Sequence, residues 1–369
     1  MNSSVAGQLL SKVMNWDDAT LAGEAPKLLF LASIKYDAYD QYMPGTRFMA
    51  SLVQWLVQFD TVEERQKAYE MVKEKLIFIS STQVTYLVKL LYTTKIKQDI
   101  FNQVADELKE KPYMVKRIEN SSEYKMSTRS SLIVGLSDGA HIDVLRRTAG
   151  FNNDQVLTNY YPNLDKAQDM LNELAKDESM RGVENPKFGT LYLIDDFTAS
   201  GTSFIRKEGD EYKGKICKVL GELDEEGSAF NLMFRSKSTI RIRLLFCIAS
   251  EYALRYIEKV VNAYLTEKGL LRRFDIKIDA VQIINDTISN EVKSDAELIK
   301  VAQKYFLDSD EVMTKSYCKG KCDFPYLGYN EGALPIILSH NTPNNSLPLL
   351  WQYTTNFKGL FPRVNRHIQ

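Results

Sequence analysis

The sequence predicts an α/β protein in which a mostly parallel sheet is flanked by helices and follows a helical N-terminal region. Two observations lead to this prediction. The first ~110 residues carry apolar side chains at helical spacing. From about residue 125, short apolar runs alternate with helix-sized segments, which is typical of βαβ units. We therefore expect a helical region over 1–120 and an α/β domain over 121–369, whose C-terminal segment lies on the substrate side.

The N-terminal region contains clear helix signals. RFMASLVQWLVQF (47–59) has apolar residues at helical spacing, and we expect Trp55 inside the core. Thr61, with Glu64 three positions later, forms the capping-box pattern for the start of the next helix, which we expect over 61–76.

Five apolar runs are candidates for the strands of the sheet. They are SLIVGL (131–136), TLYLID (190–195), IRIRLLFCIAS (240–250), IDAVQII (278–284) and ALPIILSH (333–340). Helix-sized segments separate them, so the strands are expected to be parallel and doubly wound.

Composition and charge exclude several classes of protein. The 47 basic and 48 acidic residues give a net charge of −1, which provides no global field for binding nucleic acid or an anionic membrane. The sequence shows neither a signal peptide nor an apolar stretch of membrane-spanning length, so we expect a cytoplasmic protein without membrane partners. Its four cysteines form no disulfide framework. Cys318 and Cys322 have no second ligand pair nearby, so we expect no zinc site.

The segment LYLIDDFTASGTS (191–203) is the strongest functional signal. Its apolar strand runs into Asp195 and Asp196, which places two carboxylates at the rim where parallel sheets bind ligands. The small and hydroxylated residues that follow have the composition of an anion-binding loop: Thr198, Ala199, Ser200, Gly201, Thr202 and Ser203. We expect a helix SFIRKEG directly after this loop. A sugar phosphate would suit carboxylates beside such a loop; the alternative is a strand that ends in a capped turn.

This pattern resembles the phosphoribosyl-diphosphate (PRPP) signature of type I phosphoribosyltransferases. The resemblance implies the fold of that family, with Asp195 and Asp196 as the catalytic pair that holds the ribose hydroxyls and, through the ligand, Mg²⁺. Residues 198–203 would bind the 5′-phosphate. Family members often carry Thr-Gly-Gly-Thr, so Thr202 replaces the second glycine.

A second part of the family pattern lies upstream. SLIVGLSDGAHIDVLRR (131–147) is a strand, the turn Ser137-Asp138-Gly139 and a helix that starts near Ala140. In the family, the backbone amides of this turn meet the pyrophosphate. Asp138 stands where members commonly have a basic or glycine residue, and it would repel pyrophosphate unless Mg²⁺ bridges the two. The alternative is a plain left-handed turn.

The C-terminal segment LGYNEGALPIILSHNTPNNSLPLLW (327–351) resembles a bacterial conflict-system branch of phosphoribosyltransferases, which occurs among antiphage defence genes including retron operons. A polar pocket that reads a base or acceptor is one interpretation of His340, Asn341, Thr342, Asn344 and Asn345. A structural loop held by Asx-turns is the other.

Together these features predict a phosphoribosyltransferase-like enzyme that binds PRPP with Mg²⁺ and acts on a nucleobase, a nucleotide or PRPP itself. The resemblance implies an effector of antiphage defence, with a reverse transcriptase of a retron complex or a DNA-binding protein as partner; homo-oligomerisation stays open. The alternatives are a non-catalytic PRPP or nucleotide sensor or scaffold in a defence complex, and a housekeeping salvage enzyme. We expect a mobile loop over the site within 161–189.

Overall fold

The computed structural model describes residues 3–234, 239–307 and 323–363, and the chain divides into two compact units. We call residues 1–83 with 285–369 the helical unit and residues 84–284 the sheet unit. This division differs from the boundary expected at residue 120, because residues 84–120 pack with the sheet, whereas the segment after residue 284 packs with the N-terminal helices. Cys318 and Cys322 lie outside the described residues.

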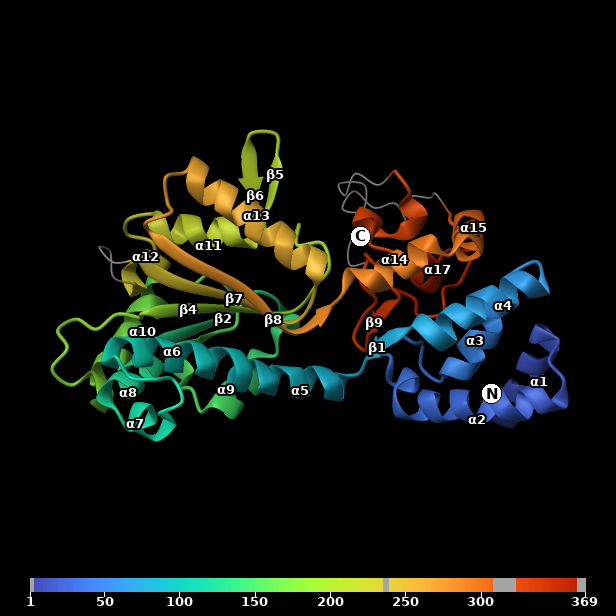
Figure 1. The fold of residues 1–369 in the computed structure, drawn as a ribbon, viewed down its shortest axis with the longest axis horizontal. Coiled ribbons are helices and arrows are strands. Elements are labelled where there is room, and N and C mark those ends of the chain that lie inside the picture. Colours follow the sequence, from blue (N-terminus) through green and yellow to red (C-terminus); the bar gives the residue numbers. More distant parts are fainter. Residues whose placement is uncertain (1–2, 235–238, 308–322, 364–369) are drawn as a thin grey trace. The chain divides into compact units, whose positions relative to one another are not determined.

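The helical unit is built from both ends of the chain (Figure 1). Among the described residues, its α-helices are α1 Ser3–Met14, α2 Asp18–Ile34, α3 Phe48–Leu56, α4 Val62–Glu70, α14 Asp286–Ser294, α15 Ala296–Lys304 and α17 Pro348–Trp351. The predicted capping box of Thr61 and Glu64 is confirmed at the start of α4. Trp55 is fully buried, and its indole N–H donates to the carbonyl of Leu349 at 2.9 Å. One core thus joins the two chain ends.

The fifth strand candidate belongs to this unit and not to the main sheet. Within 333–340, only β9 Ile336–Leu338 is a strand, and it pairs in parallel with β1 Ile77–Ile79. The run is cut short at both ends: Pro335 has no N–H to donate, and Leu338 and Asn341 bond to each other in a tight turn. The prediction that residues 333–340 form a strand of the main sheet was therefore wrong.

The sheet unit contains a five-stranded, fully parallel sheet in the order β3-β2-β4-β7-β8. The strands are β2 Ser131–Gly135, β3 Val156–Leu157, β4 Thr190–Thr198, β7 Ile240–Ser250 and β8 Phe274–Ile284. The predicted parallel α/β fold is confirmed, and four of its strands were expected. After β2 the chain turns first to one side, to β3, and then back to the other, to β4. The carboxyl ends of β2 and β4 therefore flank the switch point at which such sheets bind ligands.

Helices cover both faces of this sheet. They are α5 Ser81–Leu91, α6 Lys97–Leu108, α7 Val115–Glu119, α8 Ser122–Arg129, α9 Ile142–Ala149, α10 Leu164–Lys176, α11 Lys215–Asp224, α12 Ala229–Met233 and α13 Glu251–Glu267. Figure 1 shows α11 and α13 above the sheet and α6 and α9 below it. On the lower face, Tyr192 of β4 donates to Asp99 of α6, which also pairs with Arg243 of β7. The sheet is thus buried on both sides, as parallel sheets are.

The segment expected as a mobile cover is part of the folded layer instead. Residues 164–176 of this segment form α10, whose Met170 and Leu174 are fully buried. Lys187 comes just before β4 begins, at the amino edge of the sheet and away from the carboxylates. The expectation was wrong because α10 carries an apolar face that the core buries.

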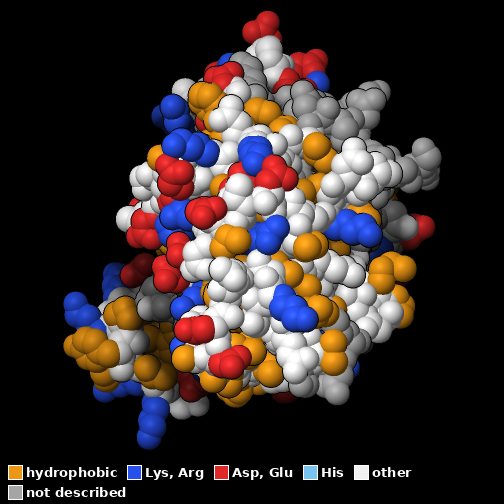
Figure 2. All heavy atoms as spheres, turned by 90° about the vertical axis from the view of Figure 1, so that its right-hand side faces the viewer, with side chains coloured by type: hydrophobic (Ala, Val, Ile, Leu, Met, Phe, Trp, Pro, Cys, Tyr) orange, Lys and Arg blue, Asp and Glu red, His pale blue; other side chains and the backbone are white. Residues whose placement is uncertain are grey.

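The face drawn in Figure 2 has no large patch of a single kind of side chain among the described residues. On that face, basic and acidic side chains of the described residues are interspersed with hydrophobic ones. Within the described ranges, the structure has no helix that combines the length and the hydropathy needed to span a membrane.

Candidate active site at the carboxyl edge of the sheet

Asp195 is the most constrained residue of the site. It stands near the end of β4 and is 2% exposed. Its Oδ1 accepts from the hydroxyl of Ser137, in the loop after β2, and from the backbone N–H of Asp196. Its Oδ2 accepts from Lys215 Nζ at 2.8 Å. Both carboxylate oxygens are therefore engaged, one of them by a cation, and the Ser137 contact joins β4 to the turn after β2.

Asp196 has a different environment. Its Oδ1 accepts from the backbone N–H of Phe197 at 2.9 Å, and Gly139 lies against its carboxylate. Burial, together with the charge of Asp195, raises the pKa of Asp196 to about 7. A bound cation would lower the pKa of such a carboxyl group again, so that the group is ionised at neutral pH.

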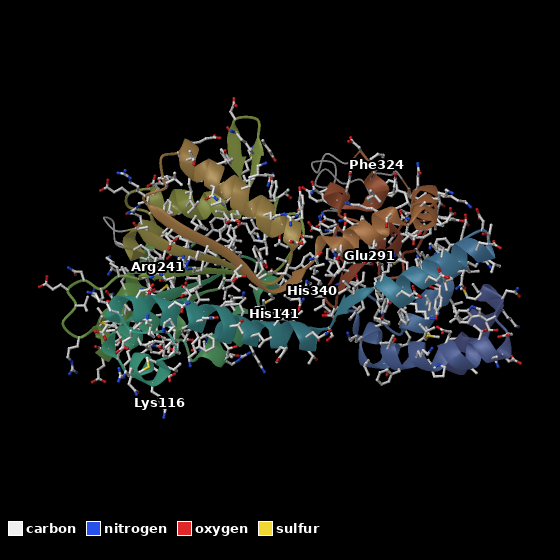
Figure 3. The ribbon with its side chains drawn as sticks, viewed as in Figure 1. Lys116, His141, Arg241, Glu291, Phe324 and His340 are labelled. Atoms are coloured by element: carbon white, nitrogen blue, oxygen red, sulfur yellow. The ribbon has the colours of Figure 1, made fainter. Side chains whose placement is uncertain are left out.

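The loop after β2 requires a glycine because of this contact. A Cβ at Gly139 would lie 2.6 Å from Asp196 Oδ2. The loop forms a short 3-10 turn over Asp138–Ala140, and the residue with left-handed backbone angles is His141, at φ 47°. The alternative of a plain left-handed turn at Gly139 is thus wrong, and the glycine serves the close approach of the two loops. Figure 3 places His141 and Arg241 at opposite edges of the sheet, which marks the carboxyl and amino ends of its strands.

The predicted phosphate loop begins as Thr198 ends β4. In it, the hydroxyls of Ser200 and Thr202 lie 3.0 Å apart, and Gly201 has φ 75°. A Cβ on Gly201 would lie 2.6 Å from Ile257 of α13, so the glycine lets the loop pack on this helix. Ser250 anchors the loop as well, since its hydroxyl donates to the Ala199 carbonyl at 2.6 Å. The loop is therefore held close to the N-terminus of α13.

The helix expected directly after this loop, over SFIRKEG (203–209), does not form. Phe204 and Ile205 enter the core, and the chain then forms a hairpin of β5 Arg206–Glu208 and β6 Glu211–Lys213. Gly209, at φ 62°, supplies the turn of the hairpin. The prediction was wrong because the charge-dense segment 208–215 pairs with the residues before it. α11 begins only at Lys215.

Lys215 is a site residue that the sequence analysis missed. Gly214 has φ 130°, and a Cβ there would lie 2.3 Å from the Phe204 carbonyl oxygen. This close approach brings the start of α11 beside the phosphate loop, where the Lys215 N–H donates to the Ser203 carbonyl at 3.2 Å. The Lys215 side chain extends over the Phe204 ring to Asp195. The available signal was a glycine directly before a lysine in a charged stretch.

The residues expected on the base or acceptor side all lie in the helical unit. Thr342 is fully buried, and its hydroxyl bonds to the Tyr39 hydroxyl at 2.8 Å and to the Phe361 carbonyl at 3.1 Å. The amide of Asn345 donates to the Tyr329 carbonyl, and the Asn341 side chain accepts from the backbone N–H of Thr342. These contacts favour the structural interpretation for these three residues. His340 and Asn344 are half-buried, and their interpretation as acceptor-side residues stays a prediction.

The donor set decides which cation the site suits. The two aspartates offer only carboxylate oxygens, the ligands that Mg²⁺ prefers. Among the described residues, no group of three or more His, Cys, Asp or Glu side chains is placed to hold a metal ion. Mg²⁺ would therefore need oxygens from a bound ligand to complete its coordination, as it does in many phosphate sites.

Comparison with known proteins yields one finding. A protein-family model described as PRTase-CE matches residues 52–363. No curated protein and no solved structure matches the chain.

Proposed function

The chain belongs to the phosphoribosyltransferase-like PRTase-CE family, and from this premise we propose that it binds PRPP with Mg²⁺ at the carboxyl edge of its sheet. The main support for the proposal is that three elements lie together at the switch point between β2 and β4. Asp195 and Asp196 of β4, the turn of Gly139 and the loop 198–203 occupy this one edge. Carboxylates suit ribose hydroxyls and Mg²⁺, and the loop suits the 5′-phosphate.

The proposed reaction is transfer of the 5-phosphoribosyl group. The bond between C1 and the pyrophosphate oxygen breaks, pyrophosphate takes the electron pair, and a nitrogen nucleophile or water attacks the cationic C1. Bound Mg²⁺ would neutralise charge on the leaving pyrophosphate. Asp196 would hold this cation and stabilise the positive ribose, while Ser137 and Lys215 keep Asp195 in place.

A second candidate, a non-catalytic PRPP sensor or scaffold, is favoured by one specific observation. Asp195 already has a cationic partner in Lys215 and a hydroxyl partner in Ser137. An acid neutralised in this way gives less stabilisation to a developing positive charge. In either form we place the protein in bacterial antiphage defence, with a retron reverse transcriptase or DNA-binding protein as partner; the likeness of residues 327–351 to the conflict-system branch supports this.

Pyrophosphate release separates the two candidates. The protein is incubated with PRPP, Mg²⁺ and a mixture of nucleobases and nucleotides, and ³¹P NMR follows free pyrophosphate. An enzyme releases it, and Asp195→Asn with Asp196→Asn abolishes the release while the matched exposed change Asp210→Asn does not. Intact PRPP after prolonged incubation with a protein that binds it would contradict the enzyme reading and support the sensor.

A further inference from the structure

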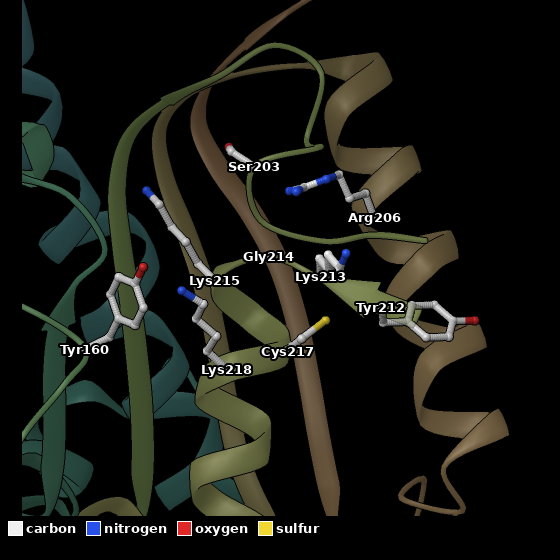
Figure 4. Close-up of a pocket in the computed structure, with 9 residues that line it drawn as sticks. All are labelled: Tyr160, Ser203, Arg206, Tyr212, Lys213, Gly214, Lys215, Cys217 and Lys218. Carbon is white, nitrogen blue, oxygen red and sulfur yellow. The ribbon is translucent and has the colours of Figure 1, made fainter. Parts of the chain in front are cut away.

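A basic cavity lies in the sheet unit between the hairpin β5–β6 and α11 (Figure 4). Its volume is ≈ 530 Å³, within the range of small-molecule sites. Four cationic side chains line it, namely Arg206, Lys213, Lys215 and Lys218, and its lining contains no acidic side chain. In Figure 4 the Arg206 guanidinium points into the space beside Ser203, while Lys215 and Lys218 extend from α11 on the side of Tyr160.

The charges around this cavity do not balance. Glu208 pairs with Arg206 at 2.6 Å and with Lys213 at 3.0 Å, and Glu211 pairs with Lys213 at 3.5 Å. Lys215 pairs with Asp195. The four cations of the lining thus have three carboxylate partners, which are Glu208, Glu211 and Asp195. The cation left over is Lys218: it donates to the phenol of Tyr161 at 2.8 Å and, within the described part of the chain, forms no ion pair.

The uncharged side chains that line the cavity include tyrosine rings and one thiol. They suit contact with the rings of a ligand, and they offer no ionised nucleophile. Tyr160 and Tyr212 line the cavity from different elements, and the rings of Tyr160 and Tyr161 are 4.3 Å apart. Burial and the Tyr161 hydrogen bond raise the pKa of Tyr160 to about 12, so its hydroxyl stays a donor. Burial also raises the pKa of the Cys217 thiol to about 11, so it stays neutral at physiological pH.

We propose that this cavity is a second anion site that binds the phosphate of a nucleotide-like ligand beside the ribose donor. Ser203, at the end of the donor's phosphate loop, forms the border between the two sites. Lys218 and Arg206 would bind the phosphate, and the Tyr160 ring would contact the nucleoside part. The proposal rests on the proposed function in one respect only, which is that the donor occupies Asp196, Gly139 and the loop 198–203. Lys215 lines this cavity and also pairs with Asp195 of the donor site. A ligand in the cavity would therefore lie next to the donor, so the second proposal identifies the acceptor as a phosphorylated molecule.

AMP titrated calorimetrically into the full chain tests this proposal. The protein is first saturated with ribose 5-phosphate, so that the predicted phosphate loop is filled, and Mg²⁺ is omitted. We expect AMP to bind under these conditions and adenosine to bind at least about tenfold more weakly. We expect Lys218→Ala to weaken AMP binding by about tenfold or more, and the matched exposed change Lys259→Ala on α13 to leave it unchanged. Both lysines are exposed, so neither change should disturb the fold.

The remaining outcomes each decide the question. Absence of AMP binding to the protein saturated with ribose 5-phosphate would overturn the second site, and so would equal AMP affinity in Lys218→Ala and Lys259→Ala. Adenosine that binds as tightly as AMP would also overturn it. Inorganic phosphate serves as a further probe. Binding weaker than that of AMP supports a nucleotide as the ligand, and equal binding contradicts a contact between Tyr160 and the nucleoside part. Mg²⁺-dependent PRPP binding by the same preparation is measured separately, so failure here leaves the proposed function to be judged independently.

Discussion

Replacing Asp195 and Asp196 singly by asparagine should change stability in opposite directions at neutral and higher pH. Asparagine at 195 can still accept from Ser137, but it removes the carboxylate that faces Lys215 at 2.8 Å. The Lys215 side chain is only 22% exposed, so its ammonium would lose a charge-assisted bond with little compensation from water. Such a loss costs about 1.5–3 kcal/mol of unfolding free energy, so we expect Asp195→Asn to be destabilising by about 2 kcal/mol.

Asp196→Asn should be stabilising, and the gain should depend on pH. The pKa of Asp196 is raised to about 7 in the folded protein, above its ordinary value near 4 in the unfolded chain. The folded state therefore binds the proton more tightly, and the parent loses stability as the pH rises from about 4 through 7. Asparagine does not titrate. Since each pKa unit is worth ~1.4 kcal/mol and the two acids are coupled, we expect a gain of about 1–3 kcal/mol at pH 8 and almost none at pH 4.

Urea unfolding of the parent and both variants at pH 4, 6 and 8, without divalent cations, measures these differences. Asp210→Asn, on the exposed hairpin turn, is the control for removal of one negative charge. If Asp196→Asn had the same effect at pH 4 and pH 8, or if both site variants were equally destabilising, the assigned environments of the two acids would be refuted.

Three further changes test other parts of the fold and site. Gly201→Val should lower the free energy of unfolding, measured in urea, by well over the ~1 kcal/mol expected for Gly209→Ala, because both positions have positive φ but only Gly201 packs on a helix; equal effects would argue against that contact. Gly139→Ala should lower Mg²⁺-dependent PRPP affinity in calorimetry by roughly ten- to a hundredfold, since it displaces Asp196; unchanged affinity would separate this loop from the site. Trp55→Phe should be destabilising by about 2 kcal/mol or more in urea unfolding, as it leaves a buried carbonyl unpaired; a neutral change would contradict the shared core.

Local signals in the sequence were sufficient to predict the sheet and its acidic edge. The strand that carries Asp195 and the strand before Ser137 are long apolar runs, and parallel order followed from the helix-sized segments between them. Their carboxyl ends lie at one edge of the sheet, because the strands are parallel.

What the sequence did not predict depends on contacts between distant segments. β3 has only two residues, so no periodicity marks it. The pairing of β9 with β1 joins residues about 260 apart in the chain, as in Ile77 and Ile336. The hairpin before α11 stands where the sequence analysis expected the helix SFIRKEG, because its two short strands pair with each other. Its position beside Asp195 follows from a close backbone approach at Gly214, which composition does not show.

Calorimetric titration of PRPP with Mg²⁺ into the parent, Asp196→Asn and Asp210→Asn tests the central claim most directly. The account predicts Mg²⁺-dependent binding by the parent and by Asp210→Asn with equal affinity. It predicts a loss of about 10- to 150-fold in Asp196→Asn, which corresponds to one charge-assisted contact. Undiminished PRPP affinity in a folded Asp196→Asn protein would contradict the assignment of this sheet edge as the PRPP site.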